Sequence, residues 1–449
     1  MAPYIYQTSN FAANNWLSAR PDPISLLRGP SSHVQTRSSG EGRGLGLFTT
    51  RSIPAYSEIL REAPLILLEP TDDLPQLYEQ FISLRKPGSD EALQRRYLAL
   101  SHQEVPQRDQ RLREKLTERG FDAATVEEMV LVASIMQTNA FNVDVGNGMG
   151  CNYRALFPQI ARINHSCVPN AHVCYYPSST STITAAEKTA SSLHHHHHRR
   201  RQEGRMVVHA LRNLHEGEEV QIAYFSILLS RPERQTKAQK WGFTCRCPAC
   251  ELLPTRHDNA TDDDDGKSMR RHEQVRTAVV DFTTKKTALL MQQQQQQTKN
   301  HRTSSSSSSA VKQITNLITL GHNTISQVLD DEDDNDDNHT GGFHPTLPDL
   351  YSNLSELQAR ALLLLRSRER KSRPHQQHNE EVEKEDVISS LQLAAIWEAK
   401  LTGRESPATK KRLLQLEKCA ARQDATTCSP RIVAGTGIGA YAIEWMSPS

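Results

Sequence analysis

The segment 162–170 combines several side chains that could hold a ligand or a metal. It reads Arg-Ile-Asn-His-Ser-Cys-Val-Pro-Asn and lies between two runs that favour extended structure. Asn164 offers an amide that both donates and accepts, His165 an imidazole, and Cys167 a thiol that is a soft metal ligand once deprotonated. Pro169 fixes its own φ and favours an extended residue before it, which predicts a turn. Such a turn suits a polar ligand, and the alternative is a surface turn with an incidental free cysteine.

A second group of reactive side chains is a set of three cysteines. Cys245, Cys247 and Cys250 follow one another at C-x-C-x2-C spacing. Zinc favours sulfur and nitrogen ligands, and a structural zinc site needs four of them. The fourth ligand would have to come from another part of the chain. The alternative is three free cysteines in a loop.

Two further stretches have features of a binding site. Gly42–Phe48 is a glycine-rich turn, in which backbone amides approach a ligand closely, although an ordinary hairpin turn has the same composition. Glu216–Tyr224 reads Glu-Gly-Glu-Glu-Val-Gln-Ile-Ala-Tyr and predicts a turn followed by a strand that ends at a tyrosine. A tyrosine at a strand end usually packs its ring, so Tyr224 alone carries little information.

In this order, the four stretches resemble those of the SET-domain protein lysine methyltransferases. The order is more specific than any single stretch. The SET-and-MYND group is the nearest pattern, because its post-SET cysteines share the C-x-C-x2-C spacing. This chain has no cysteine between Gly42 and Gly150, so we expect the MYND zinc finger of that group to be missing. Partner docking that depends on the finger is not carried over.

The resemblance implies that S-adenosyl-L-methionine donates a methyl group to a protein lysine. It places Tyr224 at the catalytic tyrosine position and makes Cys167 the fourth ligand of one structural zinc, with Cys245, Cys247 and Cys250. His165 could otherwise be a core histidine. Gly242 stands where the family usually has a bulkier residue. The implied cofactor contacts are Glu41, Arg43, Leu45, Asn139, Asn164, His165, Trp241 and Phe243.

Composition limits the binding partners and the cellular compartment that we expect. The 449 residues contain 53 Lys and Arg and 52 Asp and Glu, a formal net charge of +1. A global basic field is therefore missing, and direct binding to nucleic acid is not expected. We find neither a run of 18 apolar residues nor a secretory signal, so no membrane association is expected. Eight cysteines do not make a disulfide scaffold, which favours the cytosol or the nucleus.

The sequence predicts an α+β protein, in which a β-rich SET fold is joined to a helical insert, a post-SET zinc segment and a helical C-terminal region. Hydrophobic residues make up only 37% of the chain, so part of it should not pack. Apolar residues at helical spacing predict four helices within 71–136 and five within 267–421. The expected divisions are a flexible arm (1–35), the SET domain (36–229, with the helical insert 71–136 and a low-complexity insert 177–205), the post-SET zinc segment (230–252), a low-complexity and helical linker (253–345) and the helical C-terminal region (346–449).

Several alternatives stay open from the sequence. The C-terminal helices would form either a degenerate tetratricopeptide-like domain or an unrelated tail. His194–His198 could bind a divalent metal, or it could be part of a solvated hairpin. We expect a monomer that acts on a protein with an exposed lysine, either a histone or a non-histone protein. The other hypotheses are a catalytically silent SET-fold module that binds proteins and a zinc protein that binds nucleic acid.

Overall fold

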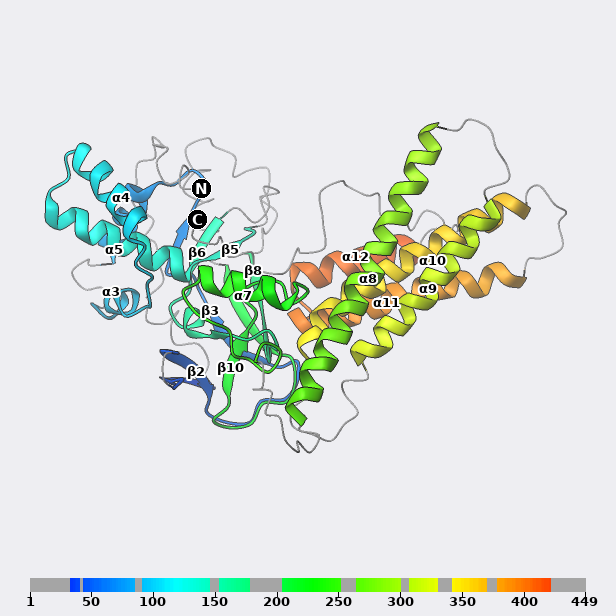
Figure 1. The fold of residues 1–449 in the computed structure, drawn as a ribbon, viewed down its shortest axis with the longest axis horizontal. Helices are drawn as coiled ribbons and strands as arrows, with labels where there is room; N and C mark the ends of the chain where they lie inside the picture. Colours follow the sequence, from blue (N-terminus) through cyan, green and yellow to red (C-terminus); the bar gives the residue numbers. More distant parts are fainter. Residues whose placement is uncertain are drawn as a thin grey trace, which may run out of the picture.

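The computed structural model describes residues 33–40, 43–84, 91–145, 153–177, 204–251, 264–299, 307–329, 341–369 and 378–420. The strands and the first four helices of this part lie on one side of the molecule, and the long helices of residues 264–420 lie on the other (Figure 1). The expected α+β class is confirmed. The arm at the N-terminus, the histidine tract and the insert around it lie outside the described residues, apart from their edges.

Short strands of the described chain form three small sheets. One sheet has the order β1-β2-β10-β7, the second β3-β9-β8 and the third β4-β6-β5. Among the described strands, only β7 and β10 are parallel to each other, and the other paired strands are antiparallel. The strands are β1 (Val34–Ser38), β2 (Leu45–Thr49), β3 (Glu58–Glu62), β4 (Ile66–Leu68), β5 (Phe141–Val143), β6 (Tyr153–Leu156), β7 (Asn164–His165), β8 (Ala171–Tyr176), β9 (Arg205–Ala210) and β10 (Glu219–Ile222).

The strand pattern differs from the expectation at two places. The apolar run that ends at Leu68 predicts one continuous strand, but it is divided into β3 and β4, which belong to different sheets. Pro64 lies between them and has no backbone N–H to donate, which favours a break in the pairing. The first strand, β1, begins at Val34, within the segment that the sequence assigned to a flexible arm.

The helical insert contains the four expected helices, with ends that differ by a few residues. Helix α2 begins with a capping box, in which Asp73 accepts from the backbone of Gln76 and the Gln76 side chain accepts from the backbone of Asp73. The helices share a buried core with β4 and β6. They are α2 (Leu74–Ser83), α3 (Glu91–Leu98), α4 (Pro106–Glu118) and α5 (Ala123–Asn139).

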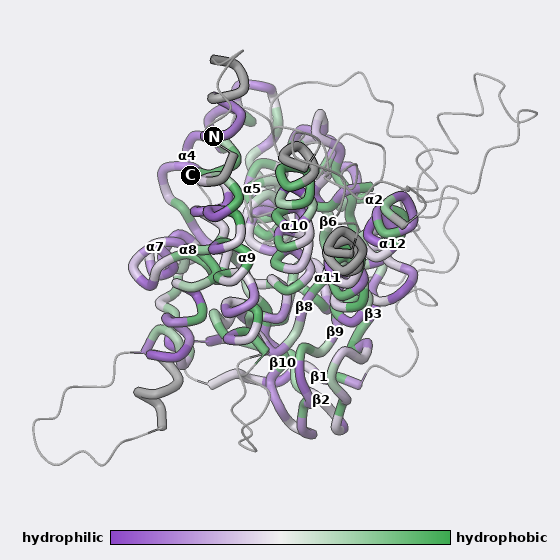
Figure 2. The backbone as a smooth tube through the Cα atoms, turned by 90° about the vertical axis from the view of Figure 1, so that its right-hand side faces the viewer, coloured by the Kyte–Doolittle hydropathy of each residue, from purple (hydrophilic) through white to green (hydrophobic). Residues whose placement is uncertain are grey.

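Long helices follow the sheets, after helix α7. Apolar and polar stretches alternate along α9, α10 and α11 in Figure 2, and these helices share a buried core with α8. Among the described residues, no helix is both long enough and apolar enough to span a bilayer. The helices are α7 (Arg231–Lys240), α8 (Asp264–Lys299), α9 (Ser307–Leu329), α10 (Leu347–Glu369), α11 (His378–Thr402) and α12 (Pro407–Ala420).

The glutamine tract corrects one expectation. The polar composition of Gln292–Gln297 predicts an unordered tract, because it offers no apolar surface to bury, but the tract continues helix α8. Glutamine is a good helix former, and extending an existing helix avoids the cost of nucleation. The helix is nucleated upstream, where Val275, Val279 and Phe282 are buried.

The C-terminal helices pack directly on the sheets. Tyr56, in the turn before β3, has a left-handed backbone with φ of 60° and donates or accepts a hydrogen bond with His344 Nδ1 at 3.1 Å. Its ring also meets the edge of Trp397 of α11, with centroids 5.8 Å apart. At the end of α11, the carbonyl of Thr402 accepts a hydrogen bond from the hydroxyl of Tyr176 in β8. These contacts tie α11 to the sheet β3-β9-β8.

A buried carboxylate supports the segment that leads into 162–170. Glu62 is only 3% exposed and accepts hydrogen bonds from the backbone N–H groups of Gln159, at 3.0 Å, and Ile160, at 2.9 Å. These groups open the short 3-10 helix η2 (Ile160–Arg162). Burial raises the pKa of Glu62 to about 7, and the two backbone bonds only partly offset this. Glu62 thus fixes the start of the turn, but its burial costs more free energy when the carboxyl is ionised.

We predict that the wild type loses stability relative to Glu62→Gln as the pH rises. The pKa of Glu62 is raised above its ordinary value of 4.5. The contribution of Glu62 to the free energy of unfolding is therefore fully present below pH 4.5 and is lost as the pH rises through about 7. At about 1.4 kcal/mol per pKa unit, the free energy of unfolding of the wild type should fall by about 3 kcal/mol relative to that of Glu62→Gln. Urea unfolding of both proteins between pH 4 and 8 measures it. A difference that does not vary with pH would contradict the prediction.

Candidate functional site

The parallel pairing of β7 with β10 brings Tyr224 beside the turn at 162–170. Gln221 lies opposite Asn164, and Ile222 lies opposite His165. Tyr224 follows two residues later, and its backbone N–H donates to His165 Nδ1 at 3.0 Å. Strand pairing and this side-chain hydrogen bond therefore join two segments whose bonded residues are 59 positions apart in sequence.

His165 is buried and makes a second polar contact. Burial lowers its pKa to about 3, so the ring is neutral at pH 7. Because Nδ1 accepts from Tyr224, the proton of the neutral ring is on Nε2. That nitrogen lies 3.3 Å from the sulfur of Cys167. The imidazole therefore connects the backbone of Tyr224 to the cysteine of the same turn.

The hydroxyl of Tyr224 is held against the same turn. It donates to the carbonyl of Ile163 at 2.7 Å. Its ring lies 5.8 Å from that of Trp241 and 6.2 Å from that of Phe243, between centroids. Burial raises the pKa of the phenol, with a smaller contribution from Glu219, so the phenol keeps its proton at neutral pH. Tyr224 thus offers a fixed, protonated hydroxyl next to two aromatic rings.

The glycine-rich turn forms a polar corner with Asn164 and Glu219. One oxygen of the Glu219 carboxylate accepts from the Ser39 hydroxyl at 2.7 Å and from Asn164 Nδ2 at 2.8 Å. The other oxygen accepts from Arg43 at 2.9 Å. A Cβ at Gly46 would overlap Ser39 Oγ and lie 2.5 Å from Glu219. Only glycine leaves room for this corner, which brings β2, β7 and β10 together.

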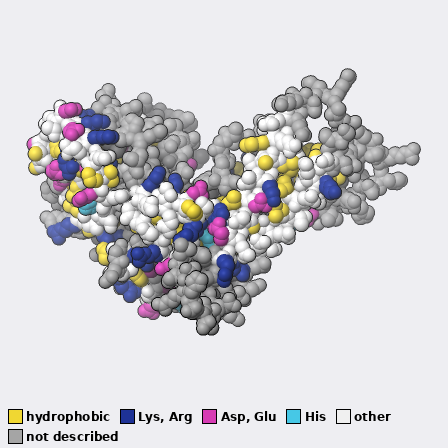
Figure 3. All heavy atoms as spheres, viewed as in Figure 1, with side chains coloured by type: hydrophobic (Ala, Val, Ile, Leu, Met, Phe, Trp, Pro, Cys, Tyr) yellow, Lys and Arg dark blue, Asp and Glu magenta, His cyan; other side chains and the backbone are white. Residues whose placement is uncertain are grey.

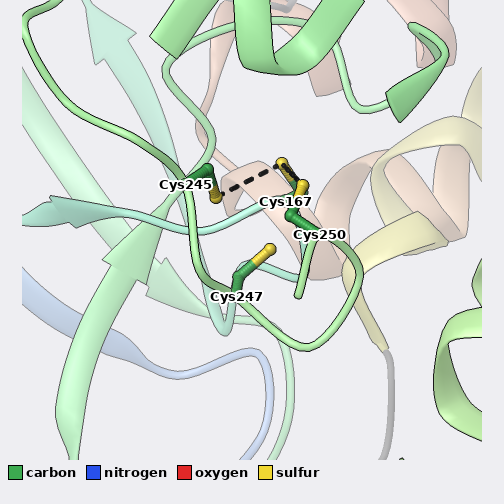
Figure 4. Close-up of side chains that lie close together, drawn as sticks. All are labelled: Cys167, Cys245, Cys247 and Cys250. Carbon is green, nitrogen blue, oxygen red and sulfur yellow. Dashed lines mark hydrogen bonds between the residues drawn. The ribbon is translucent and has the colours of Figure 1, made fainter. Parts of the chain in front are cut away.

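Four cysteine sulfurs converge from two segments. Cys167 comes from the turn after β7, and Cys245, Cys247 and Cys250 come from the loop after α7 (Figure 4). All four sulfurs lie within 4.8 Å of one another, and Cys167 lies 3.5 Å from Cys250 and 3.9 Å from Cys245. A tetrahedral zinc with bonds of about 2.3 Å would separate its sulfurs by about 3.8 Å. The donor type, number and spacing therefore fit a zinc ion.

Helix α7 holds the cysteine loop by side chains on one of its faces. Arg231 donates to the carbonyl of Cys250 at 2.8 Å. Arg234 donates to the carbonyl of Ala249 at 3.1 Å, and Gln235 donates to that of Cys245 at 2.8 Å. The loop is thus fixed to the helix through its backbone, which leaves the sulfurs of the cysteines free to converge.

Gly242 has a conformational role at the end of α7. Its φ is +77°, and its N–H and that of Phe243 bond back to the carbonyls of Gln239 and Ala238. This is the glycine-terminated end of a helix, which other residues adopt with strain. The turn aims Phe243 at His165, with ring centroids 5.7 Å apart.

Glu41, Leu45 and Asn139 are the remaining residues that were predicted to contact the cofactor. Glu41 lies outside the described residues. Leu45 faces solvent with 49% of its surface exposed, while its carbonyl accepts from Asn164 at 3.3 Å. Asn139 ends helix α5 and donates to the carbonyls of Ser101 and Ile135, at 2.6 and 2.8 Å. The structure thus gives Asn139 a bracing role in the insert and shows no bond from it to the other site residues.

Three residues of the site were not identified from the sequence. Glu219 was part of a noted acidic turn, but nothing distinguished it from its neighbours. Arg234 is 1% exposed on α7, and His272 of α8 lies with Nε2 3.2 Å from the carbonyl of Cys167. The sequence gives no signal that an arginine of a polar helix is buried, and the pairing of His272 depends on tertiary contacts alone.

The surface around these elements has no single-sign field on the face shown in Figure 3. Lys and Arg side chains are interspersed with Asp and Glu among the residues coloured there. This agrees with the formal net charge of +1.

Comparison with known proteins identifies the domain. Residues 44–225 match the SET domain. The chain is 30% identical over 100 residues to the histone-lysine N-methyltransferase ATXR2 of Arabidopsis thaliana, covering 22% of this chain and 16% of the relative. It is 24% identical over 121 residues to the histone-lysine N-methyltransferase Smyd1 of Mus musculus, covering 27% of this chain and 22% of the relative.

The chain is also similar to a solved structure, that of the SET domain of LSMT bound to lysine and AdoHcy. The aligned region covers 94% of this chain and 98% of the chain in that structure. It has 12% identity and a TM-score of 0.33, a likeness too weak to support conclusions about this chain. The segment matched in the two methyltransferases is a small part of each. The match to the SET domain itself extends from the glycine-rich turn to the strand end at Tyr224, and we conclude that the chain carries a SET domain at residues 44–225.

Proposed function

We propose that the chain is an S-adenosyl-L-methionine-dependent protein-lysine N-methyltransferase. The observation that carries the proposal is the attachment of Tyr224 to the residues on both sides of Asn164, through its backbone to His165 and through its hydroxyl to Ile163. This attachment places the phenol between the turn at 162–170 and the rings of Trp241 and Phe243. The two relatives named as histone-lysine methyltransferases support the same activity.

The polar corner suits the amino-acid part of the cofactor. That part carries an ammonium and a carboxylate. Arg43 is a cation that attracts the carboxylate, while Glu219 and the amide of Asn164 supply acceptors for an ammonium. Trp241 and Phe243 offer ring faces for an adenine. We therefore propose Arg43, Asn164, His165, Trp241 and Phe243 as cofactor residues, with Leu45 contributing its backbone; Glu41 and Asn139 are the remaining candidates.

The reaction needs a neutral lysine and accurate alignment. When bound, the cofactor supplies the methyl group, whose bond to sulfur breaks as the bond to nitrogen forms. Deprotonating a lysine with a pKa near 10.4 costs about 4.6 kcal/mol at pH 7. A narrow channel walled by rings lowers this cost because it disfavours the charged amine. The Tyr224 hydroxyl would orient the amine, and positioning would supply most of the remaining acceleration.

We further propose one structural zinc held by Cys167, Cys245, Cys247 and Cys250. The ion would join the loop after α7 to the turn after β7, so Phe243 and Trp241 would be held over Tyr224. The domain divisions are proposed as the sequence analysis gave them, with the zinc segment at 230–252. A histone is favoured as a substrate by the names of the two relatives, and a non-histone protein is the alternative; neither a membrane nor direct nucleic-acid binding is proposed.

We predict that Tyr224→Phe lowers methyl transfer by about 100-fold, the scale of effect that a small misplacement of reacting groups has. The assay follows labelled methyl groups from S-adenosylmethionine onto lysines of a protein mixture. Tyr78→Phe is the matched control, since its hydroxyl bonds Glu128 in the helical insert. Cofactor binding by the wild type without any transfer would favour the catalytically silent module.

We predict that Cys247→Ser removes the zinc and lowers the melting temperature, because a structural site needs four ligands and its metal contributes to folding. Elemental analysis of the purified protein measures the metal. Cys174→Ser is the control, because Cys174 is a free thiol in β8 outside the cluster. An unchanged zinc content in Cys247→Ser would refute the zinc site.

We predict that Glu219→Gln weakens the binding of S-adenosylhomocysteine by about 10-fold or more, as expected when a charged group loses its hydrogen bonds. The amide would no longer orient Arg43 and Asn164 together. Isothermal titration calorimetry gives the affinity. Glu216→Gln changes an exposed carboxylate in the same acidic turn and should bind like the wild type. Equal affinities for both variants would exclude the polar corner from cofactor binding.

A further inference from the structure

Arg234 is a buried cation that forms no ion pair with a carboxylate of the described residues. Its side chain is among the largest that the structure buries completely, with 1% of its surface exposed. Its two terminal nitrogens donate to the carbonyls of Leu229, at 2.7 Å, and Ala249, at 3.1 Å. Its Nε has no hydrogen-bond partner among the described residues. Both of these carbonyl acceptors are neutral, so they do not balance the charge of the guanidinium.

The carboxylate that could balance this charge is already in use. Glu273 of α8 interacts electrostatically with Arg234, but its carboxylate forms an ion pair with Arg276 at 2.5 Å. A buried charge is expensive unless it is paired, because it gives up its hydration. A fixed, fully buried guanidinium therefore indicates a nearby negative charge that the side chains of the described acidic residues do not provide.

The cysteine cluster is the group that could supply it. Ala249, whose carbonyl accepts from Arg234, immediately precedes Cys250, and the sulfurs of Cys167, Cys247 and Cys250 all act electrostatically on the guanidinium. Four neutral thiols would leave Arg234 unbalanced. Four thiolates around a divalent ion carry a net charge of −2, which a single buried cation reduces to −1.

We propose that Arg234 is the buried counter-charge of the metal–thiolate cluster and that it sets how tightly Cys167, Cys245, Cys247 and Cys250 retain their metal. This rests on the zinc site proposed above, but not on methyl transfer. Residues beyond the direct ligands commonly tune metal affinity in this way. Lys240 provides an internal contrast, since it is a cation of the same helix whose side chain is exposed.

The test compares metal retention in the full-length wild type, Arg234→Gln, Arg234→Lys and Lys240→Gln. Zinc content is measured by elemental analysis, and zinc release is followed with a chromogenic chelator in excess. We expect Arg234→Gln to release zinc about 10- to 100-fold faster, the usual scale for a residue that supports metal ligands. Arg234→Lys keeps the charge but not the fork of donors, so it should stay close to the wild type, and so should Lys240→Gln.

Comparing Arg234→Lys with Arg234→Gln separates an effect of the charge from an effect of side-chain packing. A role in packing alone predicts that both substitutions speed zinc release equally, because both lose the two carbonyl bonds, and this result would overturn the proposal. Release from Arg234→Gln at the wild-type rate would also overturn it while leaving the zinc site intact. If Arg234→Gln does not fold, Arg234→Lys decides: retained zinc supports the counter-charge and rapid loss refutes it. A wild type without zinc refutes both proposals.

Discussion

The site depends on the imidazole of His165, which joins two groups that would otherwise be independent. On one side Nδ1 accepts from the backbone of Tyr224, and on the other Nε2 lies 3.3 Å from the sulfur of Cys167. The short parallel pairing of β7 and β10 makes both contacts possible because it places Ile222 opposite His165. A change in register by one residue would turn these side chains to the opposite face.

This arrangement explains why the surrounding groups are buried and fixed. Glu62 holds the entry to the turn, and α7 holds the cysteine loop by its carbonyls. Helix α8 adds a contact from the C-terminal side, where His272 lies beside the carbonyl of Cys167. The turn at 162–170 is thus supported from the sheets, from α7 and from the long helices, which favours a rigid pocket over an adaptable one.

Much of the architecture could be predicted because it depends on local patterns. Apolar spacing located the helices of the insert and of the C-terminal region, and motif order indicated the SET domain. The spacing of Cys245, Cys247 and Cys250 gave three possible metal ligands, while Cys167 came only from the resemblance. The break at Pro64 and the helical glutamine tract were missed, since local propensity is overridden by sheet pairing in one case and by an upstream helix in the other. Arg234 and Glu219 could not be found, because their roles arise from burial and from partners distant in sequence.

The central claim is that the cysteine cluster and the cofactor pocket form one mechanical unit through His165, Trp241 and Phe243. The most direct test is calorimetric titration of S-adenosylhomocysteine into the zinc-loaded protein and into the same protein after the metal is removed under reducing conditions. The account predicts that metal removal weakens binding by about 10-fold or more, within the usual range of coupling between linked sites. Equal affinities, with the fold intact by circular dichroism, would contradict it.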